Sequence, residues 1–495
     1  MQEHIRALIV IIFLSGIGFA IAKKIVREGV LASDFNRWRN VWFAVTITAF
    51  LSHNYWLYLL ISGFLILLLT KQSQNKMALF FILLFVIPPI GNTIPGLGLV
   101  NYIITLTHPR FIALIILLPA AVVAFKNNNF KFTKIGADKF LLIYILLLIA
   151  LGLRDTTITD ALRKSFYILI DIVLPYYVAS RSIKDLSQMK TVLSAFVTSA
   201  VVFSLIAIFE NVKHWLLYNS LGDALGTGSS SISNFLARSG GLRALATLDH
   251  PITLGYFMSV AFGFYLFLSN SIQNTTVKRM GFLLIILGLL APLSRGPWVG
   301  ATVLIIAYVL QGPMAIKKLS TLFLAAIISF SILAVLPGGQ KYINLIPFSG
   351  ETEKGNITYR EQLFENSMIV IKRNPLFGSS NYLETPEMLE MMQGQGIIDI
   401  VNTYLGVALE AGYVGLTLFI GIFITVIGGV RKNMKLIKDQ KNHLHILGRC
   451  LVAVLFAIMI TIATTSSIGT VPIIYWSVLG LGVAYTQIVK QNTLP

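Results

Sequence analysis

The sequence predicts an all-α fold: a polytopic transmembrane helical bundle of about 14 helices (12–14), with a large, partly helical extracytoplasmic loop. Two observations lead to this prediction. Of the 495 residues, 56% are hydrophobic and only 12% are charged, whereas soluble domains carry about 25% charged residues. The apolar residues also fall into runs close to the roughly 20 residues that cross a bilayer as a helix. A soluble enzyme and a disordered scaffold are therefore excluded.

The apolar runs divide the chain into five parts. We expect N-terminal transmembrane helices over 1–209, an extracytoplasmic loop over 210–250, central transmembrane helices over 251–336, a large extracytoplasmic loop with an amphipathic helix over 337–401, and C-terminal transmembrane helices over 402–495. The expected spans are 5–22, 54–70, 77–93, 99–125, 138–153, 161–180, 189–209, 251–269, 281–294, 296–312, 320–336, 402–429, 446–464 and 472–489. Residues 41–53 form an extra segment or extend the next helix.

The basic residues predict the orientation of the chain. The net charge is +18, and Lys and Arg cluster at 71–76, 126–139, 181–190, 278–279, 317–318 and 431–449. Short cytoplasmic loops carry such an excess, so membrane topology explains the charge and nucleic acid is not an expected partner. Six arginines then lie on the outer side, against this bias, and need another explanation: Arg154, Arg238, Arg243, Arg295, Arg360 and Arg373.

The first candidate functional element is Ser294-Arg295-Gly296-Pro297, which lies between two apolar runs. It places Arg295 at the outer membrane boundary. Pro297 suits the first turn of a helix, and the N–H groups and dipole at a helix start suit a phosphate. The alternative is an interfacial arginine that only reaches for water.

The second element is Gly240-Gly241-Leu242-Arg243, followed by Asp249-His250-Pro251. Arg243 can hold a phosphate by its two-pronged guanidinium, and His250 has the pKa range of a general base. The alternative is that Asp249 and His250 cap the helix that begins at Pro251.

Two further elements follow. Residues 359–373 have the apolar spacing of an amphipathic helix with Arg360 in its first turn. Such a helix either covers a cavity or lies on the surface with its charges solvated. Asp399 and Asn402-Thr403-Tyr404 open the segment 402–429, which contains Glu410-Ala411-Gly412. A glutamate there is costly unless it is paired or faces a cavity, and the glycine allows close helix packing.

In this order, the four elements resemble the O-antigen ligase/polymerase superfamily, membrane glycosyltransferases that join lipid-linked glycans outside the cytoplasmic membrane. The R-x₅-D-H-P-x₃-G stretch at 243–255 is similar to the family's R…hPn.lg element, Ser294-Arg295-Gly296 to its S-R-G motif, the run from Arg360 to Pro375-Leu376-Phe377-Gly378 to its R…w…a…PllG.G element, and the run from Asn402 to Leu416 to its HN.yL…e.G..G element. The resemblance covers roughly 240–425. Family ligases carry a histidine where this chain has Val401, and the second glycine of PllG.G is absent.

The resemblance implies a polyprenyl-diphosphate-linked glycan as donor and a glycan, lipid or protein acceptor, with an active site on the periplasmic face of the bacterial inner membrane. Fixed cations stabilise such a diphosphate as it leaves. The expected catalytic residues are Arg243, Arg295, Arg360, His250 and Asp399, with His250 and Asp399 preferred as bases over Glu384 and Glu387. The expected substrate-binding residues are Arg238, Ser294, Tyr359, Asn402 and Tyr404. Inversion at the anomeric carbon is expected from the family.

The partners and the reaction class remain expectations. No Cys/His cluster has metal-ligand spacing, so we expect no metal and no cofactor. Membrane lipids and a regulator of chain length are further expected partners. Three functions are open: a polysaccharide polymerase, which Val401 favours, a ligase that transfers finished glycan to lipid A core or protein, and a transporter or flippase of lipid-linked glycan. The last is disfavoured because no internal repeat is visible.

Overall fold

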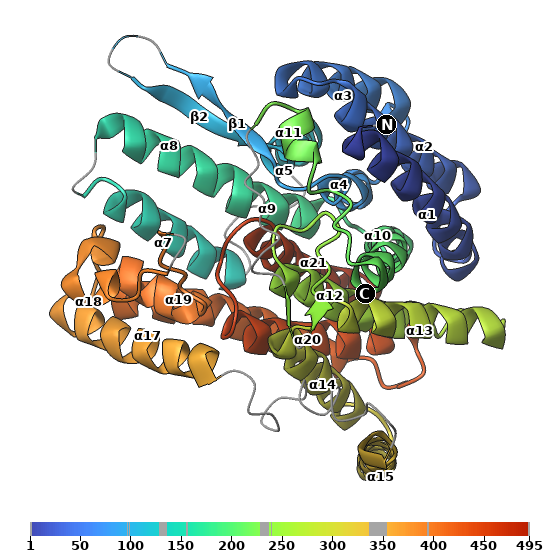
Figure 1. Ribbon diagram of the computed structural model, residues 1–495. Helices are drawn as coiled ribbons and strands as arrows, with labels where there is room; N and C mark the ends of the chain where they lie inside the picture. Colours follow the sequence, from blue (N-terminus) through green and yellow to red (C-terminus); the bar gives the residue numbers. More distant parts are fainter. Residues whose placement is uncertain are drawn as a thin grey trace.

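The computed structural model describes residues 2–96, 98, 100–127, 136–154, 157–227, 237–238, 240–335, 354–393 and 396–493. Within them the chain is a bundle of helices with two small antiparallel sheets (Figure 1). The helices that follow one another from the N-terminus are α1 (Glu3–Ile25), α2 (Ala32–Leu51), α3 (Tyr55–Thr70), α4 (Lys76–Leu84), α5 (His108–Ile112), α6 (Leu118–Lys126), α7 (Gly136–Leu151), α8 (Ile158–Ile168), α9 (Leu174–Arg181), α10 (Leu186–Lys213) and α11 (Leu221–Ala224). The second half has α12 (Pro251–Leu268), α13 (Thr275–Leu290), α14 (Arg295–Leu310), α15 (Ala315–Val335), α17 (Lys354–Arg373), the 3₁₀ turn η4 (Tyr382–Glu384), α18 (Pro386–Leu389), α19 (Thr403–Met434), α20 (His443–Ile462) and α21 (Val471–Thr493).

The helices confirm the prediction of a polytopic all-α membrane protein. In the described part of the chain, eight helices are long and apolar enough to cross a membrane, and α3 and α14 are shorter apolar helices. This is fewer than the 12–14 spans expected, because several apolar runs form helices that are short or interrupted. Residues 41–51 belong to a separate helix, α2, which begins nine residues earlier than the apolar run, at Ala32, and ends at Leu51.

Two of the helical segments contain a π-helical turn. η1 (Ala113–Leu117) joins α5 to α6, and η2 (Leu169–Val173) joins α8 to α9. In each case the turn is followed by Leu-Pro, at Pro119 and at Pro175. A proline lacks the N–H that continues the regular ladder, and a π turn is a common local adjustment of such a helix.

A β-hairpin replaces part of two expected helices. The prediction of helix over 77–93 is wrong beyond Leu84, because the chain forms β1 (Gly91–Pro95). The prediction over 99–125 is wrong before His108, because β2 (Tyr102–Thr107) pairs with β1 before α5 begins. Arg163 fastens the hairpin to α8 by donating to the carbonyl of Ile103 at 3.0 Å, and the Tyr55 hydroxyl donates to the carbonyl of Leu106 at 2.7 Å. A second, two-residue pairing joins β3 (Ala237–Arg238) to β4 (Gly241–Leu242).

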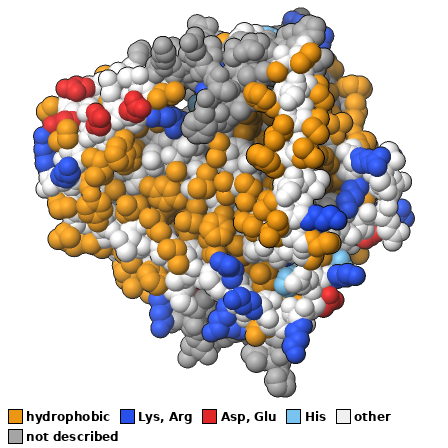
Figure 2. Space-filling model, turned by 90° about the horizontal axis from the view of Figure 1, so that it is seen from below, with side chains coloured by type: hydrophobic (Ala, Val, Ile, Leu, Met, Phe, Trp, Pro, Cys, Tyr) orange, Lys and Arg blue, Asp and Glu red, His pale blue; other side chains and the backbone are white. Residues whose placement is uncertain are grey.

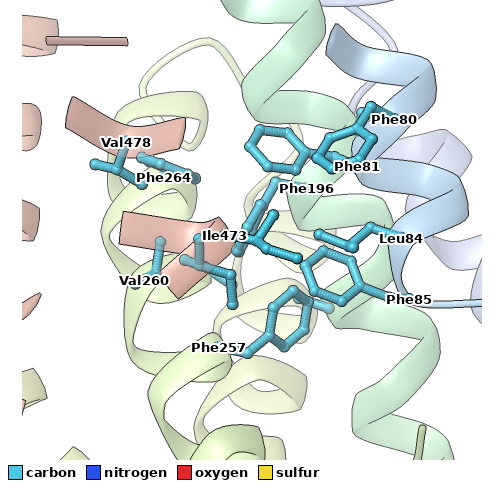
Figure 3. Packing of buried hydrophobic residues seen from close by; sticks show 14 of the residues in the cluster. Phe80, Phe81, Leu84, Phe85, Phe196, Phe257, Val260, Phe264, Ile473 and Val478 are labelled. Atoms are coloured by element: carbon cyan, nitrogen blue, oxygen red, sulfur yellow. The ribbon is translucent and has the colours of Figure 1, made fainter. Parts of the chain in front are cut away.

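The core is built from aromatic side chains of α4, α10 and α12, with α21 closing one side (Figure 3). The ring of Phe257 lies 4.5 Å from that of Phe85 and 4.7 Å from that of Phe196, measured between centroids. Phe264 meets Phe196 edge to face at 5.2 Å. Such contacts add to the stabilisation from burial itself, and they hold the helices that carry the candidate site in a fixed arrangement.

The two ends of the bundle differ in character. Lys71, Lys184 and Lys190 lie at one end, where the Asn75 side chain donates to the carbonyl of Gln188 and joins the starts of α4 and α10. We call this the basic end. The opposite end, where α10 finishes and α12, α14 and α19 begin, we call the site end. Between them the outer surface is apolar, and Figure 2 shows a broad field of hydrophobic side chains with Lys and Arg gathered toward its edges. This is the surface expected of a protein embedded in lipid.

Candidate functional site

The loop that carries Arg243 is attached to the end of α10 by a buried carboxylate. Glu210 accepts hydrogen bonds from the backbone N–H groups of Leu217, Leu245 and Ala246 at 3.1, 2.9 and 2.8 Å. The next residue, Asn211, donates to the carbonyl of Leu242 at 2.6 Å. A buried carboxylate needs such donors to remain in place, and here they hold the segment on either side of Arg243 against the bundle.

Arg243 and Arg238 both bind the turn that precedes Arg295. Arg243 donates to the Ser294 hydroxyl at 2.9 Å and to the carbonyl of Pro292 at 3.2 Å, and Arg238 donates to the carbonyl of Leu293 at 2.5 Å. Leu293 has a positive φ of 49°, so the chain turns sharply at this point. Two arginines from the loop at 237–250 therefore lie at the start of the helix whose first residue is Arg295.

Small residues allow the start of α14 to pack closely on its neighbours. A Cβ on Gly255 of α12 would lie 2.8 Å from Cγ of Pro297, and one on Gly296 would lie 2.2 Å from the hydroxyl oxygen of Thr464. Both glycines belong to the motifs recognised in the sequence. They bring α12, α14 and the segment after α20 together at the site end.

Arg360, from the segment between α15 and α19, also lies near the start of α14. It lies in α17 and donates to the carbonyls of Val401 and Thr464 at 3.4 and 3.3 Å. Thr464 is the residue whose side chain faces Gly296. Contacts therefore connect the Arg243 loop, the turn before Arg295 and the helix of Arg360 in one continuous region.

Asp399 lies beside this region in the segment that leads into α19. Ser466 donates its hydroxyl to the Asp399 carboxylate, and the Tyr359 hydroxyl donates to the Asp399 carbonyl at 3.0 Å. Thr403 donates to the carbonyl of Thr465 at 2.8 Å. The polar run after α20 thus binds the segment at Asp399 and also lies against the start of α14.

Asn402 and Tyr404 have structural partners. Asn402 caps α19 by accepting from the backbone N–H groups of Tyr404 and Leu405 at 2.9 and 3.3 Å. The Tyr404 hydroxyl donates to the carbonyl of Met459 in α20 at 2.9 Å. Both side chains therefore help to hold the start of α19, whatever further contacts they make with a ligand.

His250 occupies the cap position that the sequence offered as one of its two roles. Its Nδ1 accepts from the backbone N–H of Ile252 at 3.1 Å. Burial, aided by the nearby charge of Arg243, lowers the pKa of His250 to about 4. The imidazole is therefore neutral at physiological pH with its proton on Nε2, which makes it a hydrogen-bond donor. Burial also raises the pKa of the neighbouring Asp249 carboxyl.

Two of the six outer arginines have structural roles away from this region. Arg154, at the end of α7, donates to the carbonyls of Phe377, Gly378 and Glu410 at 3.0, 3.0 and 3.1 Å. Arg373 forms an ion pair with Glu387, which lowers the pKa of that carboxyl below its usual range and makes it a poor base. The other four arginines come from the elements that meet at the start of α14.

The third and fourth sequence elements interlock. Gly412 interrupts α19 with φ 66° and ψ −169°. The segment Pro375–Gly378 enters this break: the backbone N–H of Tyr413 donates to the Pro375 carbonyl at 2.7 Å, and the backbone N–H of Ser379 donates to the Leu409 carbonyl at 2.9 Å. Arg154 binds carbonyls on both sides of the joint, so an arginine just after α7 stabilises the contact between the segment that follows α17 and α19.

Sequence reasoning missed three groups of residues that build this region. Glu210 lies inside an otherwise apolar span, and such a residue is a signal in itself. The polar run Thr464–Ser467 between two apolar segments was also visible in the sequence. Arg154 stands out in the sequence as an arginine on the outer side, but the sequence does not indicate which carbonyls it binds. Within the described residues, no group of three or more His, Cys, Asp or Glu side chains is placed to hold a metal ion.

Comparison with known proteins gives a match to a family model. Residues 280–420 match the model of a protein family described as O-antigen ligase. The matched region contains Ser294-Arg295-Gly296, Arg360, the Pro375–Gly378 segment and the start of α19, while Arg243 and His250 precede it. No curated protein matches the chain at a significant level.

Proposed function

We propose that the chain is a glycosyltransferase that extends a lipid-linked polysaccharide, since residues 280–420 match the model of a family described as O-antigen ligase. The donor is a glycan on a polyprenyl diphosphate, and the acceptor is a sugar hydroxyl of another glycan. The observation that carries this proposal is the meeting of arginines from three elements: Arg243 bonded to Ser294, Arg295 in the next position, and Arg360 bonded to Thr464 against Gly296.

The proposed chemistry is a displacement at the anomeric carbon. The acceptor oxygen forms a bond to this carbon while the bond from the carbon to the diphosphate oxygen breaks, and the electron pair leaves with the lipid diphosphate. Negative charge grows on the leaving oxygen. Arginine is suited to stabilise it, since its guanidinium stays charged and matches phosphate geometry. A single displacement of this kind inverts the configuration, as expected for the family.

We assign the proton of the acceptor hydroxyl to the Asp399 carboxylate in preference to His250. Asp399 already accepts a hydrogen bond from the Ser466 hydroxyl, which shows that its carboxylate can face an O–H donor. His250 uses the lone pair of Nδ1 at the helix cap, so it can only donate from Nε2. We propose that this N–H binds a sugar or phosphate oxygen, and that Arg238, Ser294 and Tyr359 orient the groups around it.

The proposed site faces the periplasm from the bacterial inner membrane. This assignment rests on the basic end, whose Lys and Arg clusters mark the cytoplasmic side of a membrane protein. The region that carries Arg243, Arg295 and Arg360 lies at the opposite end of the same helices, where a lipid-linked donor would present its glycan.

The decisive experiment is an assay of the purified protein with lipid-linked repeat units. A ladder of products in the absence of any other acceptor supports a polymerase. A single transfer that requires lipid A core or a protein supports a ligase, the second candidate, which the description of the matching family favours. Failure to transfer glycan to any of these acceptors would overturn both.

The proposed mechanism also predicts an activity that does not depend on a divalent cation. Transfer measured after EDTA treatment should stay within error of the untreated rate, because arginines provide the positive charge at the diphosphate. Addition of Mg²⁺ or Mn²⁺ should give no increase. A rate that falls in EDTA and recovers with added metal would contradict this prediction.

A further inference from the structure

A cavity of about 490 Å³ lies at the basic end, far from the proposed catalytic region. Its walls come from α3, α4 and the α5–α6 segment, and its rim from the turns after α3 and α9. This volume lies within the range of about 300–1,000 Å³ that small-molecule sites occupy. The cavity is independent of the proposed function, since it involves none of the residues assigned to glycan transfer.

The rim carries three lysines from two turns. Lys71 follows α3, Lys76 begins α4, and Lys184 lies between α9 and α10. The ammonium of Lys76 lies 3.4 Å from the carbonyl of Thr70, which directs it across the turn. Arg181 also lines the cavity, but it forms a buried ion pair with Asp138.

The charge at this rim is uncompensated in the described part of the chain. None of the three lysines forms an ion pair there, and no Asp or Glu is among the described residues that line the cavity. Topology alone explains lysines in cytoplasmic turns. It does not explain why three of them surround one cavity, and that arrangement favours an anionic ligand.

The walls below the rim are apolar and open toward the lipid. Ile66 and Ile116 are buried at 1% and 4% exposure and form the inner wall, whereas Leu67 and Val123 are 62% and 58% exposed and flank the opening. Ile116 belongs to the π turn η1, and Pro119 just beyond it also lines the cavity. A small soluble anion would bind at the lysines but would leave the apolar walls of the cavity uncovered, so these walls favour a ligand with an apolar part.

We propose that the cavity binds an anionic phospholipid, with its phosphate against Lys71, Lys76 and Lys184 and an acyl chain along Ile66, Ile116 and Val123. Positive charge next to an apolar surface at the cytoplasmic leaflet is the combination that recognises such lipids. The polyprenyl-diphosphate donor is not the proposed occupant, because its diphosphate belongs at the opposite end of the helices.

The test measures binding of phosphatidylglycerol and phosphatidylcholine to the purified full chain in detergent by native mass spectrometry. Phosphatidylglycerol should bind more tightly. In the variant Lys71→Gln/Lys184→Gln its affinity should fall by about 30-fold, since each lysine near an anionic headgroup contributes roughly fivefold. The matched control is Lys438→Gln/Lys441→Gln, two exposed lysines of the basic end that do not line the cavity; its affinity should not change.

A second variant tests the apolar part of the site. Ala120→Phe adds bulk to the cavity wall and should weaken phosphatidylglycerol binding while leaving the lysines in place. Glycerol phosphate, which has the headgroup but no acyl chains, should bind far more weakly than the lipid. The proposal is overturned if both lipids bind equally, if the double lysine variant binds like the control, or if glycerol phosphate competes as well as the lipid.

Discussion

Replacing Arg295 with alanine is expected to lower the rate of glycan transfer by about 10²–10³-fold, the effect of removing one preorganised donor from a developing anion. Arg295 is the first residue of α14 and follows the turn that Arg238 and Arg243 hold. Loss of its guanidinium should leave that turn intact while removing a cation from the leaving diphosphate. The rate is measured in a single turnover with lipid-linked donor, and insertion and folding are checked by size-exclusion chromatography.

Two variants make this result specific. Arg295→Lys keeps the charge but loses the two-pronged geometry, so it should recover only part of the rate. Arg279→Ala removes an exposed arginine from the first turns of α13, at the end of that helix far from Arg295. This variant should leave the rate unchanged. Wild-type transfer by a well-folded Arg295→Ala protein would remove Arg295 from the site.

Replacing Gly412 with alanine is expected to lower the free energy of unfolding by about 1–3 kcal/mol from backbone strain alone, and to abolish activity. Gly412 has φ 66° and ψ −169°, which only glycine adopts readily. An added Cβ would also lie 2.3 Å from the carbonyl carbon and oxygen of Leu376. The Pro375–Gly378 segment could then no longer enter the break, and α17 would lose the contact that positions Arg360. Thermal unfolding in detergent measures the change.

The matched control lies in the same helix. Gly428 is a helical glycine of α19 whose added Cβ would meet nothing within 4 Å. Gly428→Ala should therefore leave the unfolding temperature unchanged or raise it slightly, because alanine favours a helix over glycine by about 0.5–1 kcal/mol. Equal stability of the Gly412→Ala and wild-type proteins would show that the interlock with α17 does not depend on this glycine.

The sequence predicted the helical membrane fold because apolar runs and basic turns report directly on a bilayer. It failed where an apolar run lies in a protein environment instead. Hydropathy predicts that one span ends at residue 93 and the next begins at residue 99, but hydrogen bonds from Arg163 and Tyr55 hold β2 in a hairpin with β1. Those partners lie far away in the sequence, and hydropathy contains no information on them.

The candidate site could also be predicted only in part from the sequence. Outer arginines were identifiable, since positive charge there runs against the topological bias, but their roles were not. Arg154 and Arg243 looked alike in the sequence, yet Arg154 stabilises the joint between α17 and α19, whereas Arg243 binds Ser294 beside Arg295. Glu210 stands out in the sequence as a carboxylate in an apolar helix, but its role could not be predicted, because its partners are backbone N–H groups, which leave no pattern of side chains.

The joint between α17 and α19 also constrains how many residues can separate Arg360 from the docked segment. α17 ends at Arg373, and the docked segment begins at Pro375, so the helix is anchored at one end with almost no slack. Each residue inserted between Arg360 and this anchor would turn Arg360 by about 100° around the helix axis. Solvent-facing side chains in this stretch can be exchanged freely, but an insertion or deletion of one residue would point the guanidinium of Arg360 away from Val401 and Thr464.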